Sequence, residues 1–168
     1  WNRLGWKDPY SKYAYTIRQE NYSRVLPEKE MYTPEMVVNG RVSFTGSNAE
    51  KARSAISTAF HTAAGTHLSF TLDSVSRDSA YIRYRIDRQN RNIVLQVAFT
   101  QSGLVSHVLR GENSGKELRH DRVVRVFYSF NQPTLNDHIA VPLSGFKPDP
   151  DTRVVLFLQN KLDQAILA

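Results

Sequence analysis

The chain has 168 residues with a formal net charge of +6, and it contains no cysteine. Its length suffices for one sizeable core or two small ones, and 40% hydrophobic with 23% charged residues is typical of a globular protein. Without cysteine these residues cannot supply thiol catalysis, disulfide bonds or cysteine-ligated metals, and no apolar run reaches the length of a membrane span.

A first helix is predicted near the start of the chain. Asp8-Pro9 places a capping residue before proline, which is common where helices begin. Residues then recur at the spacing of one helical face, at Tyr10, Tyr13, Ala14 and Ile17. Because Pro27 cannot continue a helix, we expect the helix to run from Tyr10 to about Leu26.

Residues 31–45 predict a strand, a tight turn and a returning strand. Asn39-Gly40 favours a hairpin turn in which both residues have positive φ. Pro34 cannot donate to a strand ladder and belongs at the start or edge of a strand, and an X–Pro bond is the kind that can be cis. The preceding Thr33, with Pro34 and the hairpin, resembles the cis-proline loop of thioredoxin-fold proteins.

A second helix is expected to begin after Gly46. Ser47 is followed three residues later by Glu50, as in a capping box. One apolar stripe follows at helical spacing, formed by Ala49, Ala52, Ala55, Ile56, Ala59 and Phe60. The helix is predicted to end at Gly65, where we place a boundary between residues 1–64 and 65–168.

After Gly65 the pattern changes to short alternating strands. We predict about eight of them, near residues 68–72, 82–86, 93–99, 105–109, 124–130, 139–141, 154–158 and 165–167. Long loops are expected at 111–121, 131–137 and 145–152. Short strands at regular spacing indicate an antiparallel β-sandwich or barrel, so the fold class is α+β.

The basic charge does not predict a nucleic-acid site. Arg83 and Arg85 alternate with apolar residues in a predicted strand, and Arg88 and Arg91 lie just beyond it. This pattern is typical of the solvated face of a sheet, and no nucleic-acid partner is expected.

A set of short segments carries a family resemblance. It comprises Leu4–Pro9, Arg18-Gln19, Tyr32–Gly40, Gly46-Ser47, Gly111–Gly115 and Leu118–Arg125. In this order they resemble an uncharacterised, mostly bacterial family of secreted or periplasmic thioredoxin-like proteins, a domain of unknown function. The resemblance implies a partial thioredoxin-like α/β module in residues 1–64, the C-terminal half of such a domain, followed by an antiparallel β-sandwich in residues 65–168.

The pattern of that family begins ahead of Trp1, with a strand, a Cys-x-x-Cys at the head of a helix, and a second strand. Met36-Val37-Val38 is apolar on both faces, as expected for a central strand with neighbours on each side. We therefore expect a further segment, from the same precursor or another chain, to complete the sheet. By the resemblance, Thr33 and Pro34 would bind that partner or an extended substrate.

No other chemistry is indicated. The histidines, at 61, 67, 107, 120 and 138, show no metal-ligand spacing, so no metal or other cofactor is predicted. His107 and His120 could meet in space, although surface histidines fit the same spacing. Gly111–Gly115 lacks the Gly-Lys-Ser/Thr ending of a phosphate loop and is interpreted as a tight β-loop. Whether the protein is an enzyme stays open, and no catalytic residue is assigned.

Three functions remain. The first is a non-catalytic structural or interaction protein completed by another segment or chain. The second is a fragment of a thiol–disulfide oxidoreductase whose Cys-x-x-Cys half lies upstream or in trans. The third is a β-sandwich module that binds glycans or peptides. The resemblance implies a periplasmic or secreted location, and an organellar (mitochondrial) location after removal of a presequence also fits the basic charge and the non-Met start.

Overall fold

A computed structural model describes residues 8–111 and 113–168. These residues form two helices and ten strands, and every paired strand runs antiparallel to its neighbour. The α+β class predicted from the sequence is therefore confirmed. Neither described helix, at 13 residues each, is long and apolar enough to cross a membrane.

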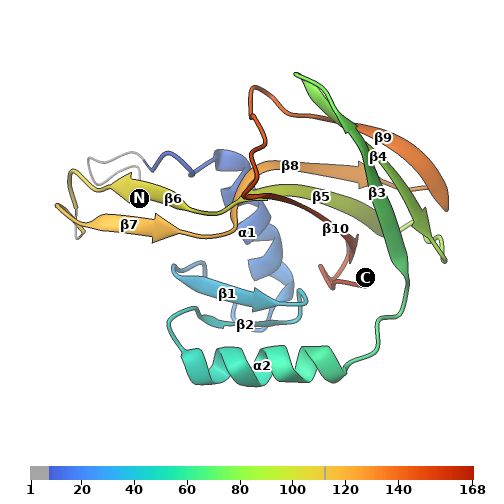
Figure 1. Ribbon diagram of the computed structural model, residues 1–168. Helices are drawn as coiled ribbons and strands as arrows, with labels where there is room; N and C mark the ends of the chain where they lie inside the picture. Colours follow the sequence, from blue (N-terminus) through green and yellow to red (C-terminus); the bar gives the residue numbers. More distant parts are fainter. Residues whose placement is uncertain (1–7, 112) are drawn as a thin grey trace.

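The N-terminal part consists of helix α1 (Tyr13–Val25), the hairpin β1 (Glu35–Val38) and β2 (Val42–Thr45), and helix α2 (Ala49–His61). The hairpin lies between the two helices (Figure 1). Helix α1 begins three residues later than predicted because Tyr10 lies in the turn ahead of it. Helix α2 is capped by Asn48, whose side chain accepts a hydrogen bond from the Lys51 N–H, and not by Ser47 as the capping-box pattern suggested.

The part after residue 65 is β-rich and contains eight strands among the described residues. These are β3 (Leu68–Val75), β4 (Ser79–Ile86), β5 (Ile93–Gln101), β6 (Leu104–His107), β7 (Glu117–His120), β8 (Val123–Asn131), β9 (Asn136–Pro142) and β10 (Thr152–Asn160). Two differ from the prediction. The expected loop at 111–121 contains β7, and residues 165–167 form only an isolated bridge between Ile166 and Gln159.

Two three-stranded sheets share the main core. Their strand orders are β10-β5-β8 and β3-β4-β9. Inward residues of β4 alternate with exposed ones, so Ile82, Tyr84 and Ile86 are buried while Arg83 and Arg85 face solvent, as predicted. They pack with the inward residues of β5, which include Leu95, Val97 and Phe99.

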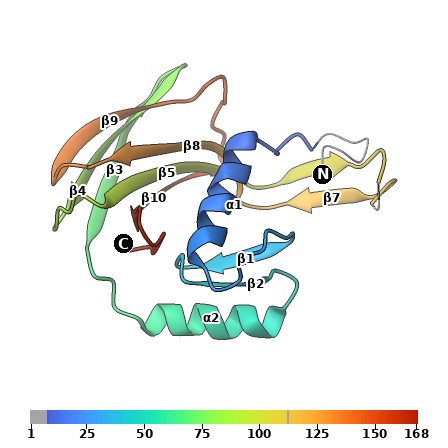
Figure 2. The ribbon, with the colours of Figure 1, turned by 180° about the vertical axis from the view of Figure 1, so that it is seen from behind.

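The central strand β5 is buried on both faces, from Ile93 to Thr100. The inner face meets the other sheet, and α1 crosses the outer face of β10-β5-β8 (Figure 2). Two bonds hold α1 to β8: Lys12 Nζ donates to the Arg125 carbonyl at 2.9 Å, and the Tyr15 hydroxyl donates to the Val124 carbonyl at 3.4 Å. Helix α1 thus links the β-rich part to the hairpin.

Strands β6 and β7 form a separate two-stranded arm. The arm projects from the β-rich part and passes above the β1–β2 hairpin in both ribbon views (Figures 1 and 2). Strand β7 is the arm strand nearer to the hairpin. The arm and the hairpin therefore flank the same side of the molecule.

Candidate functional site

The two residues predicted as a binding site, Thr33 and Pro34, are exposed and immediately precede β1. Their peptide bond is cis. Gln19 of α1 holds the loop on either side, because its amide Nε2 donates to the Tyr32 carbonyl at 2.9 Å and to Glu35 Oε2 at 3.0 Å. The loop therefore presents Thr33 and Pro34 at the surface on a fixed backbone.

Strand β1 pairs with β2 alone among the described strands. Pro34 and Val38 direct their carbonyls toward the returning strand and turn, since Pro34 O accepts from the Gly46 N–H and Val38 O from the Arg41 N–H. Backbone groups alternate in direction along an antiparallel strand. Glu35 and Val37 therefore point their N–H and C=O groups away from β2, toward an edge that has no strand partner among the described residues.

Helix α2 leaves much of its predicted apolar stripe uncovered. None of its residues is buried, and only Ala52, Ala55 and Ala59 are half-buried. Ile56 is 38% exposed and Phe60 is 85% exposed. An exposed phenylalanine next to other apolar side chains is typical of an interaction surface.

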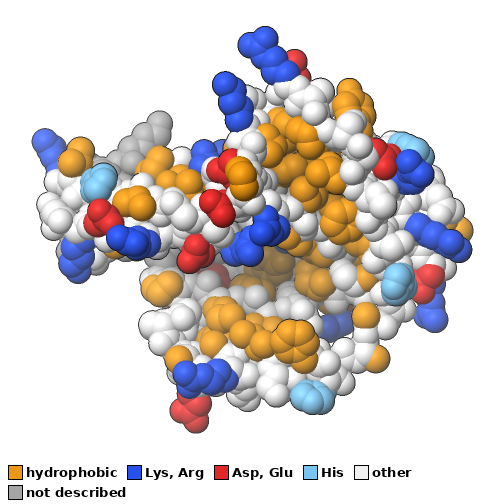
Figure 3. Space-filling model, in the orientation of Figure 1, with side chains coloured by type: hydrophobic (Ala, Val, Ile, Leu, Met, Phe, Trp, Pro, Cys, Tyr) orange, Lys and Arg blue, Asp and Glu red, His pale blue; other side chains and the backbone are white. Residues whose placement is uncertain are grey.

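A groove runs between α2, the hairpin and the C-terminal residues. Its volume is about 820 Å³, and its apolar lining includes Val42, Phe44, Ala55, Ala59 and Leu167. Figure 3 shows a strip of apolar side chains along α2, below a hollow that separates the hairpin from the β6–β7 arm. We call the free edge of β1, Ile56, Phe60 and this groove together the hairpin face.

The C-terminal residues fix the hairpin against the β-rich part. Asn39 and Gly40 both have positive φ, at 50° and 67°, which confirms the predicted turn. The Ile166 N–H donates to the Asn39 carbonyl at 2.9 Å. A Cβ at Gly40 would overlap the backbone carbonyl of Gln164, so this glycine allows a close approach of two backbones.

A polar network beneath α1 was not predicted from the sequence. The Arg18 guanidinium lies over the neighbouring rings of Phe127 and Phe157, and its Nη2 donates to the Tyr22 hydroxyl at 2.9 Å and to Gln159 Oε1 at 3.1 Å. Burial lowers the pKa of Arg18, while the charge and the hydrogen bond of Tyr22 act in the opposite direction. The guanidinium still carries its charge at neutral pH.

The network continues into the sheet through two buried amides. Gln96 Nε2 donates to Gln159 Oε1 at 3.1 Å, and Ser129 Oγ donates to Gln96 Oε1 at 2.6 Å. Gln159 Nε2 donates to the Tyr22 hydroxyl at 2.8 Å and to the Gln164 carbonyl. Gln96 inside the apolar run 93–99 was the one sequence feature that could have indicated this network, since a buried amide requires hydrogen-bond partners.

The histidines do not gather into a site. His107 and His120 lie on paired strands but at different register positions, opposite Glu117 and Leu104. His120 Nε2 lies 3.0 Å from Ser106 Oγ, and its ring meets that of Tyr10 edge-on. No group of three or more His, Cys, Asp or Glu side chains in the described part could hold a metal ion.

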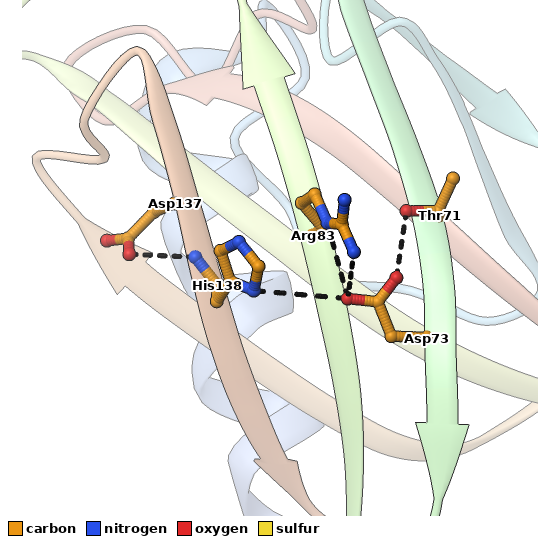
Figure 4. A network of polar contacts seen from close by, with 5 residues as sticks. All are labelled: Thr71, Asp73, Arg83, Asp137 and His138. Atoms are coloured by element: carbon orange, nitrogen blue, oxygen red, sulfur yellow. Dashed lines mark hydrogen bonds and ion pairs between the residues drawn. The ribbon is translucent and has the colours of Figure 1, made fainter.

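A second polar cluster lies on the solvent face of the β3-β4-β9 sheet (Figure 4). Asp73 accepts from Arg83 Nη2 at 3.2 Å and from Thr71 Oγ1 at 3.2 Å, and His138 Nδ1 lies 3.9 Å away. Asp137 accepts from the backbone N–H of His138. Because the Arg83 and His138 side chains are exposed, this cluster lies on a solvated sheet surface, as the alternating pattern predicted.

Comparisons with known proteins give one finding. Neither a curated protein nor a solved structure matches the chain. A family model described as "Protein of unknown function (DUF1223)" matches residues 1–159, nearly the whole chain, and the protein therefore belongs to this family.

Proposed function

We propose that this chain is a non-catalytic protein-binding module whose hairpin face accepts a strand–helix–strand segment of another polypeptide or of the same precursor. The incoming strand pairs with the free edge of β1, and the incoming helix covers α2. The observation that carries the proposal is the open edge at Glu35 and Val37 together with the uncovered Ile56 and Phe60 of α2. An apolar strand edge and an apolar helix stripe are normally covered by neighbouring strands and helices.

Energetics support an added segment. An isolated two-stranded hairpin is marginally stable, and an apolar strand edge without a neighbour is prone to pair with another chain. Burying one phenylalanine side chain contributes roughly 1.5–3 kcal/mol, and Phe60 is almost fully available for such burial. A partner that covers the hairpin face would gain both backbone hydrogen bonds and apolar contact.

The order of elements supports a thioredoxin-like reading of residues 1–64. Helix α1, strands β1 and β2 and helix α2 follow one another in the order of the second half of that fold, with the hairpin between the helices (Figure 1). The family resemblance supplies the remaining strand–helix–strand segment, which is the occupant that we propose. The periplasmic or secreted location stays a prediction from the same resemblance.

One observation favours the oxidoreductase alternative. Thr33 and Pro34 are exposed at the start of the free edge, so a segment paired with β1 would bring its own side chains next to them. Since this chain has no cysteine, any reactive thiols would come from that segment. An insulin-reduction assay of the assembled complex separates the two functions: activity supports the oxidoreductase and its absence supports the non-catalytic module.

Strand addition is tested by removing one backbone donor. In Val37→Pro the N–H that points to the free edge is lost, whereas the ladder to β2 keeps its donors. The matched control Val37→Thr keeps both the N–H and the β-branched shape. The probe is a strand–helix–strand polypeptide of the kind that the family resemblance implies, supplied as a separate chain, and complex formation is followed by size-exclusion chromatography with light scattering.

We expect the unmodified chain and Val37→Thr to form a one-to-one complex with the probe, and Val37→Pro to lose at least about tenfold in affinity. Equal binding by Val37→Pro and Val37→Thr would contradict strand addition. If the chain does not bind the probe and instead forms a homodimer, the proposal that a strand–helix–strand segment occupies the hairpin face is wrong.

A further inference from the structure

A cleft is lined by α1 and by the outer face of the β10-β5-β8 sheet. Figure 2 shows α1 crossing this face. Its volume is about 600 Å³, within the range of small-molecule sites. Arg18 and Arg24 of α1 line one wall, Gln96 and Ser129 line the floor, and Lys161 after β10 lines the opposite wall. None of these residues lines the groove of the hairpin face.

The cleft is positively charged. Three cations line it, and no Asp or Glu is among its described lining residues. Lys161 Nζ has no hydrogen bond or ion pair with any described residue, while Arg24 reaches only Glu20 of the same helix, at 3.9 Å. That pair is weak because the Arg24 side chain is 72% exposed. A negatively charged ligand would therefore meet uncompensated charge.

Arg18 is held in a fixed orientation. Three aromatic rings lie against its guanidinium, those of Phe127 at 4.6 Å, Tyr22 at 5.1 Å and Phe157 at 5.7 Å, and both of its hydrogen bonds within the described chain use Nη2. Nε and Nη1 make no hydrogen bond within the described chain, so each keeps a donor, on its own edge of the guanidinium, for another acceptor. A guanidinium that is already ordered binds a planar carboxylate at a smaller cost in side-chain entropy.

The cleft also offers neutral polar groups. The side-chain amides of Asn21 and Asn131 line it and make no hydrogen bond with any other described residue. Each amide can both donate and accept, which suits hydroxyl groups. The cations on the two walls can bind a carboxylate, and the free amides between them can bind hydroxyl groups. A ligand that carries one carboxylate and several hydroxyls therefore suits this cleft.

We infer that this cleft is a binding site for a small polyhydroxylated carboxylate of the size of a sugar acid. Arg18 donates a charge-assisted hydrogen bond to the carboxylate, Arg24 and Lys161 supply attraction from the two walls, and Asn21 and Asn131 bond the hydroxyls. The site does not depend on the occupant of the hairpin face, so either proposal can fail while the other stands.

The test is an NMR titration of the isotope-labelled 168-residue chain with glucuronate, using glucose as the neutral ligand of nearly the same shape. We expect glucuronate to produce saturable shifts at the side-chain amides of Asn21, Asn131 and Gln96, and glucose to produce none. The buried amide of Gln96 reports on the cleft floor through its bond to Ser129.

Matched variants separate the site from general charge. Arg24→Ala with Lys161→Ala removes two exposed wall cations, and we expect at least about tenfold weaker glucuronate binding. Arg85→Ala removes an exposed cation from the other sheet and should bind as the unmodified chain does. Absence of saturable shifts below about 10 mM glucuronate, equal shifts with glucose, or unchanged binding by the double variant would overturn the inference.

Discussion

Gly40 joins the two parts of the molecule at the level of a single residue. It has positive φ in the hairpin turn, and its missing side chain leaves room for the Gln164 carbonyl. The neighbouring Asn39 accepts the Ile166 N–H. The positive φ of Gly40 and its close approach to the Gln164 carbonyl are both conditions that residues other than glycine rarely tolerate.

Gly40→Ala is therefore expected to lower the free energy of unfolding by about 1–3 kcal/mol. The cost comes from a left-handed backbone and from the displaced Gln164 carbonyl. Gly65→Ala is the matched control, because no heavy atom lies within 4 Å of its added Cβ, and it should stay within about 0.5 kcal/mol. Urea unfolding of both variants measures the difference, and equal stabilities would contradict this role of Gly40.

Local rules predicted some of these residues and failed for others. Asn-Gly gave the turn correctly because its φ preference is intrinsic to the two residues. Ser47 and Asn48 are both good capping residues, and the pattern selected the wrong one. Gln96 and Gln159 are far apart in sequence, so their hydrogen bond follows only from the pairing of β5 with β10.

At the level of elements, α2 departs most from an ordinary surface helix. Its apolar stripe was predicted, yet the described residues leave Ile56 and Phe60 largely open to solvent. A surface helix normally turns such a stripe toward a core. The stripe is therefore the part of the hairpin face that a partner would bury.

Phe60→Lys tests this interpretation. Because Phe60 is 85% exposed, its loss should change the stability of the chain alone by no more than about 0.5 kcal/mol. Binding of the strand–helix–strand segment should fall by tenfold or more, since burial of the ring contributes roughly 1.5–3 kcal/mol.

The control is Ser57→Lys, which adds the same charge at an exposed polar position of α2. It should leave binding nearly unchanged. Calorimetry with the segment measures both variants, and a loss of binding that is the same for the two would indicate a general charge effect in place of a contact by Phe60.

The short strands show where element prediction reaches its limit. Strands with long alternating runs, such as β4, were predicted correctly because one face of the strand is buried and the other faces solvent. Strand β7 has only four residues, of which Leu118 alone is apolar, so the sequence carries little strand signal and the pairing with β6 supplies the structure. Residues 165–167 are apolar in sequence but form a single bridge, because they turn back against β10.

At the scale of the whole molecule, α1 holds two unlike parts together. One side of the helix carries Arg18 into the network of the β10-β5-β8 sheet, and Gln19 reaches the loop before β1. The antiparallel β-rich part followed from the sequence. The contacts of α1 with both parts could not be predicted from the sequence. They depend on side chains more than 100 positions apart, such as Arg18 and Gln159.

The measurement that tests the account most directly is hydrogen exchange at the amides of β1. In the chain alone we predict that the Val37 N–H, directed to the free edge, exchanges at least about 100-fold faster than that of Met36, directed to β2. With the strand–helix–strand segment bound, the two should become similarly slow. A monomeric chain in which Val37 is already protected as strongly as Met36 would contradict the open edge on which the proposed function rests.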